Sequence, residues 1–137
     1  MINSYNLFAV PMTHGRIPIP INIHKKVLKF VEENYKPEDS ISCVKGFQYH
    51  NDFNGKKELN NFINTYLRNV HHLEITNAWI NVLDNESYNT PHSHAGSQVT
   101  HAGVLYLSNN NNNINFARDN ETFQIKPKLF DYLIFPY

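Results

Sequence analysis

Two stretches of the chain repeat their apolar residues at the spacing of an amphipathic helix. In the first, Asn22 is suited to cap the N-terminus, and the apolar positions that follow are Ile23, Val27, Leu28, Phe30, Val31 and Tyr35. In the second, one face carries Leu59, Phe62, Ile63, Tyr66 and Leu67. We therefore predict helices over Ile23–Tyr35 and Lys57–Val70.

The second half of the chain changes to short apolar or alternating runs, which are typical of strands. The predicted strands are Ala78–Leu83, Val99–Leu107, Ile114–Phe116, Thr122–Ile125 and Tyr132–Phe135. Asparagine tolerates turn conformations, so the five asparagines from Asn109 to Asn113 predict a turn. Further strands are predicted at Phe8–Pro11 and Ile41–Phe47, and Pro18 and Pro20 make Ile17–Ile21 an extended connector.

Two helices followed by a run of short strands favour an α+β fold, in which helices pack on one side of a mainly antiparallel sheet, sandwich or barrel. A chain of 137 residues suits one domain. We expect residues 1–74 to form a helical support region and residues 75–137 to form the β core.

Composition narrows the classes of partner and compartment. The 12 basic and 12 acidic residues give no net charge, so nothing indicates nucleic acid or an anionic membrane as a partner. No apolar run is long enough for a transmembrane helix, and the first residues do not resemble a secretory signal. The single Cys43 cannot form an internal disulfide, which favours a cytoplasmic location, and we expect it to be a buried small apolar residue.

The strongest chemical signal is the segment Pro91-His92-Ser93-His94. Imidazole is the commonest protein ligand of first-row metals, and alternate residues of a strand share a face, so His92 and His94 can converge on one ion. The alternative is a pair of loop histidines bonded to solvent or backbone. For His101, seven residues further on, a hydrogen-bonding role in a strand is the preferred interpretation.

Other candidate residues have simpler interpretations. We expect His14, His24 and His50 at the surface and Trp79 in the core. The acidic residues show no paired spacing for acid–base catalysis, and the chain has no CxxC motif and no glycine-rich phosphate loop.

The order of several motifs resembles the double-stranded β-helix, or jelly-roll, oxygenases that depend on Fe(II) and 2-oxoglutarate. The nearest resemblance is to a group common in marine bacteria and phages. The matching segments are Trp79-Ile80-Asn81, Pro91-His92-Ser93-His94, Ala102-Gly103-Val104-Leu105-Tyr106-Leu107 and Phe135-Pro136, with Lys45-Gly46-Phe47-Gln48-Tyr49 upstream. The resemblance covers residues 8–137, although only the histidine segment is chemically specific.

The resemblance implies a jelly roll with two N-terminal helices packed on it, and a hydroxylase that uses Fe(II) and 2-oxoglutarate. It makes His92 the first metal ligand and His94 the second, where many relatives have a carboxylate. Tyr106 falls in the strand that commonly lines the co-substrate pocket, and packing in the core is the alternative interpretation of this residue. The substrate would be a small molecule or a peptide, and the enzyme would be cytoplasmic, in the host cytoplasm if a phage encodes it.

In the family, a third metal-binding histidine and a basic residue for 2-oxoglutarate follow the Phe-Pro strand, and the sequence here has no counterpart before Tyr137. The last strands are then expected to be missing, or to come from a second chain or another copy in a homo-oligomer. Two other functions remain open: an inactive jelly-roll module with a structural or interaction role, for example in a phage particle, and a cupin-like metal protein that does not use 2-oxoglutarate.

Overall fold

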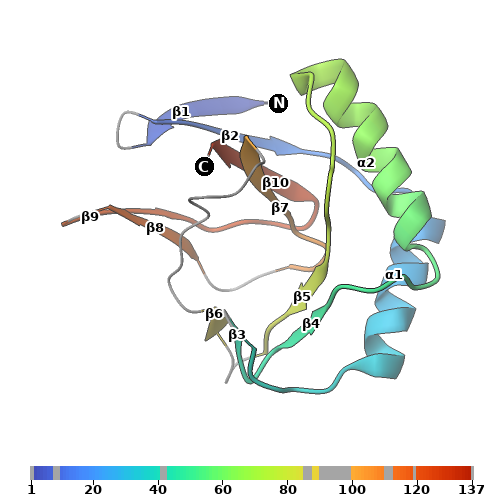
Figure 1. Cartoon of the computed structure of the whole chain (residues 1–137). Coiled ribbons are helices and arrows are strands. Elements are labelled where there is room, and N and C mark those ends of the chain that lie inside the picture. Colours follow the sequence, from blue (N-terminus) through green and yellow to red (C-terminus); the bar gives the residue numbers. More distant parts are fainter. Residues whose placement is uncertain are drawn as a thin grey trace. The chain divides into compact units, whose positions relative to one another are not determined.

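The computed structural model describes residues 2–7, 10–40, 43–84, 88–89, 100–109, 113–118 and 120–136 (Figure 1). Within these residues the fold is α+β, and every strand pairing is antiparallel. The elements are β1 (Asn3–Leu7), β2 (Val10–Arg16), α1 (Ile21–Asn34), β3 (Cys43–Val44), β4 (Phe47–Tyr49), α2 (Lys56–His71), β5 (Ile80–Val82), β6 (Tyr88–Asn89), β7 (His101–Leu105), β8 (Ile114–Arg118), β9 (Glu121–Ile125) and β10 (Asp131–Pro136).

The chain divides into two compact units. Unit 1 combines the two ends of the chain, residues 1–18 and 94–137, and unit 2 is the continuous stretch of residues 19–93. Both helices belong to unit 2, whereas the largest sheet belongs to unit 1.

Unit 1 is built on a four-stranded sheet with the order β1-β2-β10-β7. In Figure 1 the blue strands from the start of the chain lie beside the red strand β10 from its end. Leu133 in β10 lies opposite His14 of β2 on one side and opposite Val104 of β7 on the other. The pairing of β2 with β10 therefore joins segments more than one hundred residues apart in sequence.

The core of unit 1 lies against one face of this sheet. Met12 and Leu133 are almost fully buried, with 1% and 0% of their surface exposed. The β8–β9 hairpin adds two aromatic contacts: Phe123 meets Tyr5 of β1 with ring centroids 5.9 Å apart, and Phe116 meets Phe135 of β10 at 5.1 Å. Such pairs add to the free energy of burial, so the hairpin and the sheet stabilise one another.

The opposite face of the sheet requires a glycine at position 15. Gly15 and Tyr132 are paired across β2 and β10, and a Cβ atom at Gly15 would collide with the hydroxyl and ring of Tyr132. The missing side chain thus makes room for a tyrosine that is only 5% exposed.

Unit 2 contains the two helices, and each turns only part of its surface inward. Helix α1 buries Ile23 and Val27, and α2 buries Leu59. An ion pair between Lys26 and Glu58 joins the helices, with the lysine Nζ 2.7 Å from the glutamate Oε1. Both partners are well exposed, so this pair contributes little to stability.

Aromatic side chains fill the remaining core of unit 2. Phe30 of α1 stacks on Phe53 with ring centroids 4.3 Å apart, and it also contacts Tyr49 of β4 at 4.8 Å. Strand β4 pairs with β5, where Phe47 lies opposite Val82. Cys43 in β3 is fully buried, which confirms its predicted place in the interior.

The sequence predicts both helices correctly, within two residues at each end. The expected cap at Asn22 is wrong, because α1 already begins at Ile21 with Pro20 at the cap position. The carbonyl of Pro20 accepts the first helical hydrogen bond, from the backbone N–H of His24. Proline fixes its own backbone angle, so the extended connector can turn directly into the helix at this point.

The expected order of two helices followed by strands is wrong at the N-terminus. The single predicted strand at Phe8–Pro11 is replaced by the longer pair β1 and β2, and β2 is an inner strand of the sheet. Pro11 does not end β2. A proline has no N–H for pairing, and Pro11 lies opposite Asn6 of the edge strand β1, outside the part of β2 (from Thr13 onward) that pairs with β10. From β5 onward the predicted strands lie where the sequence places them, with small shifts at their ends, and β6 is a short addition. The single strand predicted at Ile41–Phe47 is wrong, because the left-handed backbone of Lys45 separates β3 from β4, and the two pair with different strands.

Neither helix in the described part of the chain is long and apolar enough to cross a membrane.

Replacing Leu133 with alanine should destabilise the protein by about 2–5 kcal/mol, because the change leaves a cavity beneath the central strand β10. Urea unfolding measures this change, and Ile21→Ala is the matched control because Ile21 is 70% exposed. The control should change the free energy of unfolding by no more than about 0.5 kcal/mol. Equal effects of the two substitutions would contradict the central place of Leu133 in the core.

Candidate functional site

The two predicted metal ligands, His92 and His94, lie outside the described residues. The segment that carries them lies between β6, which ends at Asn89, and β7, which begins at His101. Their prediction therefore still rests on the sequence. Among the residues that the structure does describe, no group of three or more His, Cys, Asp or Glu side chains is placed to hold a metal ion.

The predicted co-substrate residue Tyr106 directly follows β7 and continues its pairing with β10. Its backbone N–H donates to the carbonyl of Asp131 at 2.9 Å, and its carbonyl accepts from the N–H of Phe130 at 2.7 Å. The side chain is half-buried, and removal from water raises the pKa of the Tyr106 hydroxyl to about 12. The hydroxyl is protonated at neutral pH, as in any tyrosine, and stays protonated to a higher pH than an exposed one, so it can donate a hydrogen bond.

His101 has the hydrogen-bonding role that the sequence favours. It is exposed at the start of β7, and its Nδ1 lies 2.8 Å from the hydroxyl of Thr100. Trp79, in contrast, was expected in the core and is 44% exposed, so that prediction is wrong. The Trp79 ring stacks on the ring of His50 with centroids 5.3 Å apart, so one of its faces is covered although the side chain is exposed.

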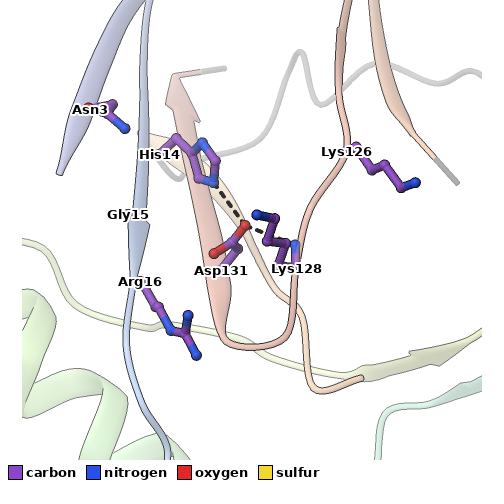
Figure 2. Close-up of a pocket in the computed structure, with 7 residues that line it drawn as sticks. All are labelled: Asn3, His14, Gly15, Arg16, Lys126, Lys128 and Asp131. Atoms are coloured by element: carbon purple, nitrogen blue, oxygen red, sulfur yellow. Dashed lines mark hydrogen bonds and ion pairs between the residues drawn. The ribbon is translucent and has the colours of Figure 1, made fainter. Parts of the chain in front are cut away.

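A polar pocket lies in unit 1, at the end of the sheet where β2 finishes and β10 begins (Figure 2). Its volume is about 250 Å³, and it is lined by Asn3, His14, Gly15, Arg16, Lys126, Lys128 and Asp131. The strand register explains how these residues meet. His14 and Arg16 alternate along β2 and share a face, Asn3 is opposite His14, and Asp131 is opposite Arg16.

Asp131 is the centre of the pocket's hydrogen bonds. Its Oδ2 lies 3.1 Å from Nε2 of His14 and accepts the backbone N–H of Lys128 at 2.8 Å (Figure 2). A carboxylate only accepts hydrogen bonds, so the contact with His14 places a proton on Nε2 of the imidazole. The Asp131 side chain is 12% exposed and that of His14 is 20% exposed. His14 is therefore part-buried, where the sequence predicted a surface residue.

Positive charge dominates the rest of the lining. Arg16, Lys126 and Lys128 carry three positive charges against the one negative charge of Asp131, so these four groups sum to +2. Within the described part of the chain, no carboxylate forms an ion pair with any of these three cations. The pocket concentrates positive charge in a chain whose total charge is zero.

This pocket could not be predicted from the sequence, because its residues form no motif of neighbouring positions. His14 and Asp131 are 117 positions apart, and only the register between β2 and β10 brings them together. The one available signal was Lys126-Pro127-Lys128, two cations on either side of a proline just after a predicted strand.

Comparison of the chain with models of protein families, with curated proteins and with solved structures finds no match.

Burial of Tyr106 predicts a loss of stability at high pH. The pKa of its hydroxyl is about 12 in the folded protein and the ordinary value is 10.0, so the unfolded chain loses the proton first as the pH rises. Folding stability should therefore fall between pH 10 and pH 12. Urea unfolding at a series of pH values should show a smaller fall for Tyr106→Phe. An unchanged pH profile in this variant would contradict the burial of the hydroxyl.

Replacing Asp131 with alanine should destabilise the protein by about 1–3 kcal/mol, because the N–H groups of His14 and Lys128 would lose their acceptor. The midpoint of urea unfolding measures the loss. Glu121→Ala is a control in the same unit, because Glu121 is exposed and the change should stay within about 0.5 kcal/mol. A neutral Asp131→Ala variant would show that these hydrogen bonds do not hold the end of the sheet.

Proposed function

We propose that this chain is an oxygenase of the jelly-roll type that depends on Fe(II) and 2-oxoglutarate and hydroxylates a small-molecule or peptide substrate. The observation that carries the proposal is the Pro91-His92-Ser93-His94 segment, followed at a short distance by the strand Ala102-Gly103-Val104. The pairing of β7 with β10 supports it, because Phe135 and Pro136 of the last matching motif lie opposite Ala102 and His101.

The same pairing is compatible with a jelly-roll core, which consists of antiparallel strands. On the C-terminal side of the histidine segment, β7 pairs with β10 and β8 pairs with β9, all antiparallel, and β1 and β2 from the start of the chain extend the sheet of β10. The strand β5, with Ile80 and Asn81 of the Trp-x-Asn motif, pairs with β4 upstream. The described strands form open antiparallel sheets, and we propose that they belong to a closed double-stranded β-helix.

The donor chemistry of the histidine segment fits a first-row divalent metal. Two neutral imidazoles two residues apart are good ligands for Fe(II), and they leave coordination positions for a co-substrate and a third protein donor. When bound, the metal and 2-oxoglutarate would activate dioxygen for oxidation of a C–H bond. The imidazoles of His92 and His94 would hold the metal in place.

Tyr106 would position the co-substrate. A tyrosine hydroxyl is protonated at neutral pH and donates to a carboxylate oxygen, and burial, which raises the pKa of Tyr106 to about 12, keeps it protonated well above neutral pH. Its backbone is fixed on both sides by hydrogen bonds to Phe130 and Asp131 of the neighbouring chain segment. A donor on such a rigid support keeps its direction when the ligand binds.

Anaerobic titration with Fe(II), then with 2-oxoglutarate, tests this function. The wild-type protein should bind Fe(II) and develop the visible charge-transfer band of the chelated complex, and His92→Ala and His94→Ala should each lower metal affinity at least tenfold. His101→Ala is the matched control, because His101 is exposed and bonded to Thr100. It should bind Fe(II) as the wild type does.

The other outcomes separate the remaining functions. Metal binding without the charge-transfer band would contradict the use of 2-oxoglutarate and favour a cupin-like metal protein. A folded protein that binds no Fe(II) would contradict the oxygenase and favour an inactive structural or interaction module.

A further inference from the structure

We propose that the pocket at the end of β2 and β10 is a binding site for a phosphate group. Three cationic side chains line it, and no ion pair holds any of them within the described residues. Its volume of about 250 Å³ lies just below the range of about 300–1,000 Å³ that is usual for small-molecule sites. The pocket therefore suits a small anion such as a free phosphate ion.

Two of the cations, Arg16 and Lys128, lie on backbone that is held in place at the end of the sheet. Arg16 is the last residue of β2, and Lys128 directly precedes the turn into β10, where its N–H is fixed by Asp131. In Figure 2 the side chain of Lys126 extends away from the His14–Asp131 pair, so we assign the main contacts to Arg16 and Lys128. The planar fork of arginine matches two phosphate oxygens, and lysine adds a point charge.

Asp131 gives the pocket its selectivity among anions. A bare anion such as sulfate would be repelled by this carboxylate, whereas phosphate at neutral pH keeps a proton that it can donate to a carboxylate oxygen. Oδ2 already accepts hydrogen bonds from His14 and Lys128. The second oxygen, Oδ1, forms no hydrogen bond with the described residues and is therefore the acceptor for the phosphate proton.

Phosphate binding at this pocket does not depend on iron or on 2-oxoglutarate. All of its lining residues belong to unit 1, and none of them is among the predicted metal or co-substrate residues. The experiment below uses the metal-free chain, so failure of the oxygenase proposal would not alter its outcome.

The test is titration of the full chain with inorganic phosphate at neutral pH, followed in an assigned amide ¹H–¹⁵N spectrum. Phosphate should shift the amide signals of Gly15 and Lys128 in a saturable manner. Sulfate should bind at least about tenfold more weakly, because it brings no proton for Asp131. The phosphate of a monoester such as glycerol phosphate has a second pKa of about 6, so it has mostly lost this proton at neutral pH and should bind more weakly than inorganic phosphate. Tighter binding of the monoester would contradict the role of Asp131 as the acceptor.

Two variants and a control locate the site. Arg16→Gln should weaken phosphate binding about tenfold or more, and Asp131→Asn should remove the preference for phosphate over sulfate. Both Arg16 and the control residue Lys57 are exposed, so these two variants should fold as the wild type does. Lys57→Gln removes one positive charge from α2 in the other unit and should leave phosphate binding unchanged.

Several results would overturn the proposal. These are shifts that do not saturate, equal loss of binding in Arg16→Gln and Lys57→Gln, or equal affinity of the wild type for phosphate and sulfate. Tighter binding of acetate or 2-oxoglutarate than of phosphate at the same amides would also overturn it, because the pocket would then be a carboxylate site.

Discussion

The antiparallel pairing of β10 with both β2 and β7 is the constraint on which unit 1 depends. β10 is the only strand of the β1-β2-β10-β7 sheet that joins the N-terminal strands to the C-terminal ones. Its first three residues are all buried, and its backbone is bonded on both sides. Within the described residues, β2 and β7 are joined in one sheet only through β10, which also supplies Leu133 to the core beside Met12.

The two ends of β10 carry the two chemical proposals. At its start, Asp131 organises the cationic pocket through His14 and Lys128. At its end, Phe135 and Pro136 lie opposite the first residues of β7, the strand that follows the predicted metal-binding segment. A single strand therefore fixes the position of the phosphate pocket and orients the strand on which the oxygenase proposal rests.

Local patterns predicted the helices and the strands from β5 onward, but not the N-terminal strands or the partners of any strand. The 3.6-residue repeat predicts both helices because each helix buries one face through nearby residues such as Ile23 and Val27. The place of β2 inside the sheet could not be predicted, because the apolar pattern stops at Pro11 and the inner partner β10 is over one hundred residues away. The cationic pocket was missed for the same reason. Tyr106 could be chosen from a motif, whereas its burial follows from the three-dimensional fold.

The division of unit 1 between the two ends of the chain also affects the order of folding. Unit 2 is continuous in sequence, so all of its partners have been synthesised once residue 93 has left the ribosome. Strand β2 is made near the beginning but has to wait for residues 131–134 before its inner edge is paired. Contacts between distant segments form slowly, because a long loop must close before they contribute any stability. During synthesis the inner edge of β2 is thus left open to non-native partners until β10 has been made.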